Sequence, residues 1–356
     1  MKVQAGPLRE AVAAIFAAAG CSSDESTGLA ANLVDANLCG HDSHGVIRVV
    51  QYIRYVNNGT VKRGQTISIV AETPTLVVVD GNLGFGQTIG RQTMALLSSK
   101  AKASGLALSS IRNSSHFGRV GAWAEQLAAD GLISLHFTTT TGLGMLAVPF
   151  GGTDRRLSLC VIAAAVPVDG RDPLLLDCAT TTTAEGKLRV ARNKGVPVPP
   201  GQIVDKDGNP STDANDFYAG GAILPMAGHK GHGLTIIADL LAGALSGGGC
   251  TAPGVTLMNS SMTSIAIDPG PVTDREAYFA EIRRFCDWVT GSPPKDEAAR
   301  VLLPGEIEHM TRAKRNRDSI AIDDETWRQI VETAASVGLD SDRFQELTSR
   351  QASETG

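Results

Sequence analysis

The chain has 356 residues, of which 42% are hydrophobic, and a formal net charge of −5 at pH 7. This length and composition are typical of a globular protein that buries a substantial core in two or three lobes. The acidic balance argues against a nucleic-acid partner, and the longest apolar runs are too short to span a membrane.

The first part of the chain predicts three helices. Pro7 suits a first helical turn, Gly20 suits a stop, and Ser22 with Glu25 forms a capping box for the second helix. The predicted helices are Pro7–Ala19, Asp24–Cys39 and a third that begins near Ser43 and runs to Val56.

Strands and helices then alternate irregularly, as β-branched runs and amphipathic segments show. The predicted strands are Ile67–Val70, Thr75–Asp80, Leu106–Ile111, Ile133–Thr138 and a set within Leu157–Asp177, broken by a turn at Asp169–Pro173. The predicted helices are Thr88–Ser104, Ala122–Ala129, Ala184–Asn193, Leu234–Leu245, Asp274–Val289 and Glu325–Val337. Because a regular βαβ rhythm is missing, the expected fold class is α/β or mixed α+β rather than a doubly wound sheet.

Three later segments carry more detailed expectations. Leu234–Leu245 is nearly all apolar, which predicts a buried helix. Asp274–Val289 is amphipathic, with Phe279 and Phe285 on one apolar stripe. The polar tail after Val337 is expected to fray.

The cysteines and the N-terminal run bear on the compartment. Six scattered cysteines without a short repeated spacing are typical of reduced, mostly buried thiols in the cytoplasm. The apolar run Leu8–Ala19 resembles the core of a signal peptide, but Arg9 and Glu10 lie at its start. We therefore expect no targeting segment.

The segment His41–Arg48 concentrates proton-handling groups: two imidazoles, a hydroxyl, a carboxylate and a guanidinium. On a helix that begins near Ser43, His44 and Arg48 would share one face. An imidazole beside a carboxylate-binding guanidinium is suited to holding an acidic substrate while moving a proton. Two simpler interpretations compete: ordinary helix-start residues, and a metal site at His41 and His44, which no second cluster of ligands supports.

Two glycine motifs invite comparison with the dinucleotide-binding fingerprint. In Gly84–Gly86 the third small residue comes one position late, at Gly90. Gly142–Ala147 has the right spacing, but Pro149 and Gly151 leave no room for the helix that should hold the pyrophosphate. Both motifs therefore predict tight turns, and a nucleotide would have to bind in another way.

Three more segments contain candidate functional residues. His116 follows a predicted strand and is either a second acid–base candidate or a satisfied, capping or buried, histidine. Asp177 ends an apolar strand, where its carboxylate would face a ligand, orient a histidine or cap the next helix. Gly228–Gly233 precedes the apolar helix and is either an anion site suited to phosphate, formed by its backbone amides together with Lys230, or a plain turn.

Taken in order, these segments resemble the type-2 malate/L-lactate dehydrogenase family, from about residue 5 to residue 335. That family also contains ureidoglycolate, sulfolactate and diketogulonate dehydrogenases and cyclic-imine reductases. The resemblance rests on His41–Arg48, Asn113–Gly118, Pro149–Gly152, Leu175–Ala179, Gly228–Gly233 and Leu303–Glu306. It implies a nicotinamide-dependent oxidoreductase with a non-Rossmann cofactor fold, and a homodimer with the active site near the subunit interface.

The resemblance also implies roles for individual residues. Ser43, His44 and His116 belong to the catalytic set, Asp177 either orients a histidine there or contacts the cofactor, and Arg48 binds the substrate carboxylate. NAD or NADP would contact Thr140, Asp177, Cys178, Ala179, His229, Lys230, Gly305 and Glu306. No metal ligand is expected.

The expected organisation has three parts: a helical segment with catalytic residues (1–72), a mixed segment (73–120 with 300–356) and a cofactor-binding domain (121–299). This chain has histidines at 229 and 232, where the family commonly or often has aromatic residues, and Asn259–Thr263 replaces a stretch that often carries Gly-His-Phe-Phe. These differences leave the substrate open.

The expected reaction is reversible hydride transfer between NAD(P) and C2 of a small 2-hydroxy acid or its 2-oxo partner. His44 is the preferred proton carrier and His116 the second candidate. The alternatives are reduction of a cyclic imino acid, a catalytically silent ligand-binding protein and a metal hydrolase.

Overall fold

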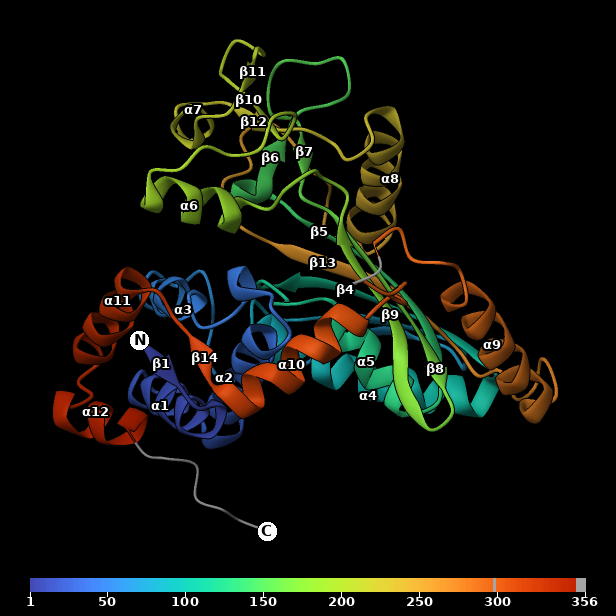
Figure 1. The fold of residues 1–356 in the computed structure, drawn as a ribbon. Helices are drawn as coiled ribbons and strands as arrows, with labels where there is room; N and C mark the ends of the chain where they lie inside the picture. The colour runs from blue at the N-terminus through green and yellow to red at the C-terminus, as the bar shows by residue number, and fades with distance from the viewer. Residues whose placement is uncertain (297–298, 350–356) are drawn as a thin grey trace.

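The molecule combines a large central sheet with a helical part on one side and a smaller sheet above it (Figure 1). The computed structural model describes residues 1–296 and 299–349. Its three sheets and interspersed helices confirm the mixed α/β class. None of the helices in these residues combines the length and the apolarity that crossing a bilayer requires.

Both ends of the chain contribute to the helical part. The short strands β1 (Lys2–Val3) and β14 (Ile320–Ala321) pair with each other and join the two ends. The apolar side chains of the surrounding helices share one core. These helices are α1 (Ala5–Ala18), α2 (Ser23–Leu38), α3 (Arg48–Asn57), α11 (Asp324–Ser336) and α12 (Ser341–Ser349).

The seven-stranded sheet forms the centre of the molecule. Its strand order is β2-β3-β4-β13-β5-β8-β9, and only β3 and β4 run parallel to each other. The strands are β2 (Ser68–Glu72), β3 (Leu76–Asp80), β4 (Leu106–Ser114), β5 (Ile133–Thr140), β8 (Val161–Val168), β9 (Arg171–Ala179) and β13 (Ser260–Ile267). A sheet of this order is not doubly wound, so it provides no ordinary Rossmann site.

Helices α4 (Gly86–Ser104) and α5 (Gly121–Ala129) cover one face of this sheet (Figure 1). Their buried side chains, among them Leu97 and Trp123, pack with strand residues such as Ile111 in a second core. Helices α8 (His229–Asp239) and α9 (Arg275–Thr290) lie on another side, and a π-helical turn, Leu240–Ala244, continues α8.

The smaller sheet has the order β11-β10-β12-β6-β7, and helices α6 (Glu185–Lys194) and α7 (Ala214–Tyr218) lie beside it (Figure 1). Buried Leu188, Ile203 and Phe217 give this part its own core. Its strands are β6 (Met145–Ala147), β7 (Leu157–Ser158), β10 (Ile203–Val204), β11 (Pro210–Ser211) and β12 (Ala222–Ile223).

The predicted helix from Ser43 to Val56 is wrong at its start. Asp42–His44 form a 3-10 turn, Gly45 is extended (φ −85°, ψ −151°), and α3 begins only at Arg48. Because a Cβ at position 45 would collide with the Asn37 side chain, this break requires glycine. His44 and Arg48 therefore do not share a face of one helix.

Other corrections concern the presence of two helices and the exposure of two more. Helix α10 (Glu306–Asp318) was not predicted, and it buries none of its residues. Helix α12 forms where a frayed tail was expected, because Phe344 and Leu347 are buried. The Leu234–Leu245 helix is not buried throughout, since Leu234, Ile237 and Leu240 are exposed, and Phe285 is exposed rather than part of a buried stripe.

The predicted domain division stays a prediction. The central sheet takes β3 and β4 from residues 73–120 and β5, β8, β9 and β13 from residues 121–299. Strands from both sides of the expected boundary thus share one set of ladder hydrogen bonds. Of the two glycine motifs, Gly84–Gly86 leads into α4 and Gly142–Gly144 forms a 3-10 turn.

Candidate active site

The first candidate residues lie in the turn between α2 and α3. Asn37 shapes this turn, because its Oδ1 accepts a hydrogen bond from the Val46 amide (2.8 Å) and its Nδ2 donates to Asp42 Oδ1 (2.6 Å). Arg315 of α10 donates to the same Asp42 oxygen, also at 2.6 Å. The turn is thus held from two helices, and His44 at its end faces a cavity.

His44 lies against His116, which follows β4 more than seventy residues later in the chain. The two imidazole rings are stacked, with centroids 5.4 Å apart and an interplanar angle of 15°. Ser43 Oγ lies 3.0 Å from His44 Nδ1, and the Tyr52 hydroxyl lies 2.7 Å from His116 Nδ1. The structure therefore brings together the three residues that the resemblance assigns to catalysis.

Arg48 is anchored so that part of its guanidinium stays available. Its Nε donates to the Ser43 carbonyl and its Nη1 to Gln51 Oε1, both at 2.6 Å. Its Nη2 has no hydrogen-bond partner within the described residues. Because the side chain is already fixed, it would bind a carboxylate without losing further conformational freedom.

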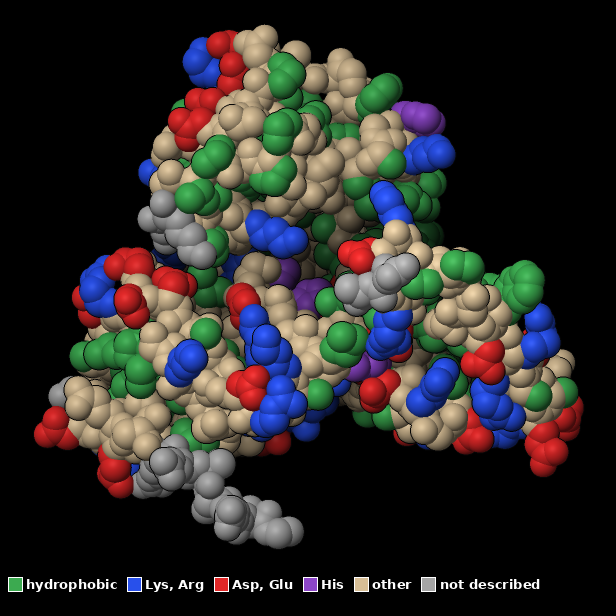
Figure 2. All heavy atoms as spheres, viewed as in Figure 1, with side chains coloured by type: hydrophobic (Ala, Val, Ile, Leu, Met, Phe, Trp, Pro, Cys, Tyr) green, Lys and Arg blue, Asp and Glu red, His purple; other side chains and the backbone are tan. Residues whose placement is uncertain are grey.

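His44, Arg48 and His116 line one cavity of about 340 Å³. Two predicted cofactor contacts, Thr140 and Ala179, line the same cavity. In Figure 2, histidine side chains are visible at the bottom of a hollow between the upper and lower parts of the molecule. This cavity is large enough for a small ligand.

The cavity also contains charged residues that the sequence analysis did not single out: Arg54, Arg155, Glu185 and Arg189. Arg189 Nη2 donates to both Glu185 carboxylate oxygens, at 2.9 Å each. Arg155 donates from Nε to a backbone carbonyl. These residues belong to no motif, and only their meeting in the fold reveals an excess of positive charge.

Both histidines of the cavity are neutral imidazoles at neutral pH. Burial, the neighbouring His116 and Arg48 hold the pKa of His44 well below its usual value of 6.5. Burial and Arg48 lower the pKa of His116 to about 3. The cavity therefore favours proton-accepting imidazoles and, with its free guanidinium nitrogen, an anionic ligand.

The two residues predicted at the start of α8 lie outside the cavity but beside it. Thr180, the neighbour of cavity-lining Ala179, accepts from the Met226 amide at 3.0 Å and from the Thr235 hydroxyl at 2.8 Å. These bonds hold the beginning of α8, with His229 and Lys230, next to the end of β9. Both side chains are exposed there.

The remaining predicted residues follow β9 away from the cavity. Asp177 Oδ2 accepts from the Gly121 amide (2.8 Å), and burial raises the pKa of this carboxyl. The described contacts include no hydrogen bond from Asp177 to a histidine, and its neighbour Cys178 is half-buried. Gly305 and Glu306 lie at the start of α10, which meets β9 where the Leu175 amide donates to Pro304.

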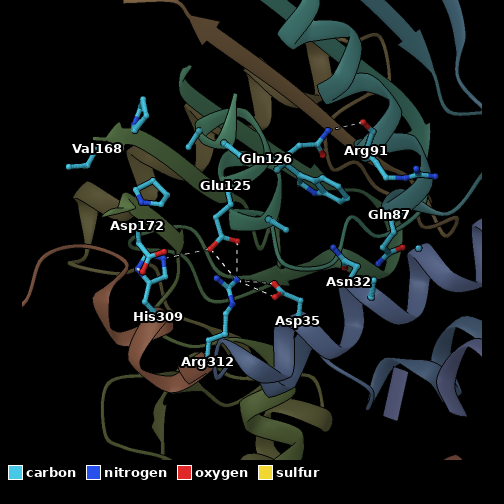
Figure 3. Close-up of a pocket in the computed structure, with 18 of the residues that line it drawn as sticks. Asn32, Asp35, Gln87, Arg91, Glu125, Gln126, Val168, Asp172, His309 and Arg312 are labelled. Carbon is cyan, nitrogen blue, oxygen red and sulfur yellow. Dashed lines mark hydrogen bonds and ion pairs between the residues drawn. The ribbon is translucent and has the colours of Figure 1, made fainter. Parts of the chain in front are cut away.

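A second cavity, of about 730 Å³, lies among α2, α4, α5 and α10. Arg312 pairs there with Asp35 (3.2 Å) and Glu125 (3.3 Å), as Figure 3 shows. Gln87 lies at its wall and donates to the Tyr52 hydroxyl, at 2.8 Å. This one side chain thus connects the wall of the second cavity with the histidines of the first.

The histidines of the turn show no arrangement for a metal ion. Across residues 1–296 and 299–349, no three or more His, Cys, Asp or Glu side chains are grouped in a way that could hold one. His41 instead lies 3.3 Å from Glu308 of α10.

Comparison with known proteins places these features in a family. Residues 3–331 match the family model described as malate/L-lactate dehydrogenase. Hydroxycarboxylate dehydrogenase B of Escherichia coli K12 is 37% identical, with 99% of each chain covered. The structure of malate dehydrogenase from Pyrococcus horikoshii is similar, with a TM-score of 0.86, 29% identity and 96% of each chain covered. Δ1-Piperideine-2-carboxylate reductase from Pseudomonas syringae has a TM-score of 0.82 at 27% identity, covering 94% of this chain and 100% of that one.

Proposed function

Because the chain belongs to the malate/L-lactate dehydrogenase family, we propose that it transfers a hydride between NAD or NADP and C2 of a small 2-hydroxy acid or its 2-oxo partner. The supporting observation is the convergence of two neutral imidazoles and an unpartnered guanidinium nitrogen in one cavity. Oxidation of a hydroxy acid removes a hydride from C2 and a proton from the hydroxyl. The site therefore needs one group for the proton and another for the carboxylate.

The chain supplies both groups. Arg48 binds the carboxylate through its unpartnered Nη2 and so fixes the face of C2 from which the hydride leaves. His44 accepts the hydroxyl proton, with Ser43 beside it, and His116 is the second candidate for this step. General base catalysis of this kind typically contributes ~10²–10⁴-fold to the rate.

The residues present also fit a dinucleotide. Helix α8 begins after Gly228 without a side-chain cap, and its first amides, at His229 and Lys230, have no partner among the described residues. With the Lys230 ammonium they form a donor set suited to a pyrophosphate. Thr140 and Ala179 lead from there into the cavity. When bound, the nicotinamide supplies the hydride acceptor or donor.

Four further residues are proposed as cofactor contacts because all of them lie on or next to strand β9. Asp177 and Cys178 lie on β9, and Gly305 and Glu306 begin the helix that meets this strand. For Asp177, its bond to the Gly121 amide favours a cofactor-side or structural role over the orientation of a histidine.

The alternative substrate class is a cyclic imino acid, which carries the same carboxylate and accepts a hydride at the same carbon. The likeness to the piperideine-carboxylate reductase is the observation that keeps this class in the test.

The test is a fluorescence titration with NADH and NADPH, followed in the same cuvette by a panel of 2-oxo acids and cyclic imines. We expect micromolar binding of at least one nicotinamide and its oxidation by a 2-oxo acid. If only cyclic imines oxidise the bound nicotinamide, the substrate class is a cyclic imino acid instead of a 2-oxo acid. If neither nicotinamide binds, the dehydrogenase proposal is wrong.

We further propose that the protein is a homodimer. Leu234, Ile237 and Leu240 are spaced by three residues and expose an apolar stripe along α8 and the π-helical turn that continues it, and Leu245 extends this stripe. Figure 2 shows hydrophobic side chains gathered in this region. A stripe of this kind marks an interaction surface. Because the helix that carries it begins at the proposed pyrophosphate site, a second copy bound to the stripe would lie beside that site. All six cysteines lack a disulfide partner, which supports a cytoplasmic location.

A further inference from the structure

The cavity holds two imidazoles where the proton chemistry needs one carrier. Their surroundings differ at the nitrogen that faces away from the cavity. We propose that Tyr52 and Gln87 are positioning residues that, with the Gly118 amide, hold His116 as a fixed Nε2–H donor to the substrate oxygen, while His44 alone exchanges the proton. This inference rests on the proposed function.

The backbone determines which nitrogen of His116 is protonated. The Gly118 amide lies 3.2 Å from His116 Nδ1 and can only donate a hydrogen bond. Nδ1 must therefore be an acceptor, and the single proton of the neutral ring lies on Nε2. The amide is itself fixed in place: Gly118 has a φ of +71°, and a Cβ there would come within 2.6 Å of Asn32 Oδ1.

Tyr52 adds a second donor to the same nitrogen. Gln87 Nε2 donates to the Tyr52 hydroxyl at 2.8 Å, so the hydroxyl proton is directed at His116 Nδ1, 2.7 Å away. Both Tyr52 and Gln87 are buried, with 0% and 3% of their surface exposed. Water therefore does not compete for either bond, and the Gly118 amide sets Nδ1 as the acceptor at the end of this chain.

The consequence appears at Nε2. This atom has no hydrogen-bond partner within the described chain, and the ring lines the cavity. It therefore presents an N–H to a ligand oxygen. A second proton would have to enter at Nδ1, where it would face the Gly118 N–H, so the ring cannot pass through an imidazolium form.

His44 is not restricted in this way. Its Nδ1 is 3.0 Å from Ser43 Oγ, and this hydroxyl has no other hydrogen bond among the described residues. A hydroxyl can rotate to donate or to accept, so it matches the neutral ring and the imidazolium equally. Because the two rings are stacked, only one of them can carry charge, and the available one is His44.

Atoms and electrons balance in the direction of oxidation. The C2–H bond breaks and its electron pair leaves with the hydrogen to the oxidised nicotinamide. The O–H bond breaks, its proton goes to His44 Nε2, and its electrons form the second C–O bond. His116 Nε2–H donates to this oxygen throughout and changes no bond.

The first test reads the tautomer directly and does not depend on activity. The protein contains seven histidines, so ¹⁵N-histidine labelling with long-range ¹H–¹⁵N correlation resolves their ring nitrogens. His116→Gln and His44→Gln assign the two signals. We expect His116 to keep Nδ1 unprotonated and Nε2 protonated throughout the pH range of the folded protein. A protonated Nδ1 would overturn the proposal even if nicotinamide binding is confirmed.

The same spectrum tests the positioning residues. Tyr52→Phe and Gln87→Met weaken the donor set at Nδ1, and we expect a second tautomer of His116 to appear in each variant. The matched control is Gln126→Met, another glutamine at the wall of the second cavity, whose Nε2 donates to the Arg91 carbonyl. An unchanged His116 pattern in both positioning variants would refute the role of Tyr52 and Gln87.

The second test uses turnover of the substrate found in the panel. Glutamine at position 116 still offers an N–H donor, so His116→Gln should retain more activity than His116→Leu, which should lose about 10²–10³-fold in kcat. His44→Gln should lose about 10²–10⁴-fold while nicotinamide binding persists. Near-normal turnover of His44→Gln, together with loss in His116→Gln, would assign the proton to His116 instead.

Discussion

At the scale of single residues, buried histidines make the protein sensitive to acid. His136 is fully buried in the central sheet, and burial lowers its pKa to about 3. Its ring nitrogens lie 2.8 Å from Ser264 Oγ and 3.0 Å from Ser134 Oγ. These bonds satisfy both nitrogens of the neutral His136 ring, so this residue is not stabilised as a cation.

This burial predicts how stability depends on pH. Between the usual pKa of 6.5 and about 3, the unfolded state binds a proton at His136 that the native state does not. The free energy of unfolding therefore falls as pH falls through this window, by up to about 1.4 kcal/mol per pH unit for this residue. His136→Gln should show a shallower fall in urea unfolding at a series of pH values. An equal slope in both proteins would contradict the assignment.

Arg48 allows a second prediction at this scale. Replacing it by methionine removes charge-assisted hydrogen bonds to the substrate carboxylate, so KM should rise about 10- to 100-fold. The methyl ester of the same substrate serves as the control, because it lacks the charge and should lose much less. Equal losses for acid and ester would mean that Arg48 supports the cavity without binding the carboxylate.

The sequence motifs predicted the residues that meet at the site, but not what orients them. His44, Arg48 and His116 carry recognisable local patterns, and they converge on one cavity. Tyr52 is an ordinary apolar-face position of a helix in the sequence, and Gln87 follows a glycine turn. Their hydrogen bonds depend on contacts between segments distant in sequence, which no local pattern reveals.

At the scale of elements, α6 supports the turn that carries His44 from the side of the small sheet. A Cβ at Gly186 would lie 2.6 Å from the Ser43 Cβ and 3.7 Å from Arg48 Nη2. The first turn of α6 therefore packs against the backbone that carries Ser43 and His44. This close approach couples the two parts of the molecule at the cavity.

Gly186→Ala should displace the turn while leaving both helices formed. Because misplacement by about 1 Å can cost on the order of 10²-fold in rate, we expect kcat to fall by as much as about 10²-fold with little change in melting temperature. Gly28→Ala is the matched control, since a Cβ at this helical glycine would meet no atom of a neighbouring element within 4 Å. Similar kinetics in the two variants would show that the close approach of Gly186 to Ser43 does not affect turnover.

Some element boundaries depend on the local sequence, and others depend on contacts with segments that are distant in the sequence. The strands predicted up to Asp177 and helices α1, α2, α4 and α5 agree with their hydrophobic patterns to within a few residues, whereas the central strand β13 was not predicted. The break at Gly45 depends on the Asn37 side chain of another helix, and so the expected continuous helix from Ser43 is not formed. Helix α10 is held by ion pairs such as Arg315 with Asp42, which hydrophobic periodicity cannot show.

At the scale of the whole molecule, the exposed stripe on α8 tests the proposed dimer. Ile237→Asp with Leu240→Asp places two charges in the apolar surface, and we expect light scattering to show a monomer where the unmodified chain gives a dimer. Ile69→Asp is the control, because this exposed residue lies on the edge strand β2. A monomer in all three samples would refute the dimer, and an unchanged dimer would place its interface elsewhere.

The class of the whole fold was predictable, but its topology was not. Irregular alternation of strands and helices indicated a mixed fold, and the two glycine motifs correctly lacked the context of a Rossmann site. The insertion of β13 between β4 and β5 joins segments more than 100 residues apart, and pairing over such distances leaves no mark in local composition.

The pairing of β1 with β14 also has a consequence for biosynthesis. Ribosomes make the N-terminal helices first, yet Val3 and Leu8 share their core with Ile320 and Phe344. Until those residues emerge, the nascent chain exposes part of the apolar surface that the finished protein covers. The turn bearing His44 also lacks Arg315 during that time. This segment is translated well before the residues that complete its core, and chaperones can engage it throughout that interval.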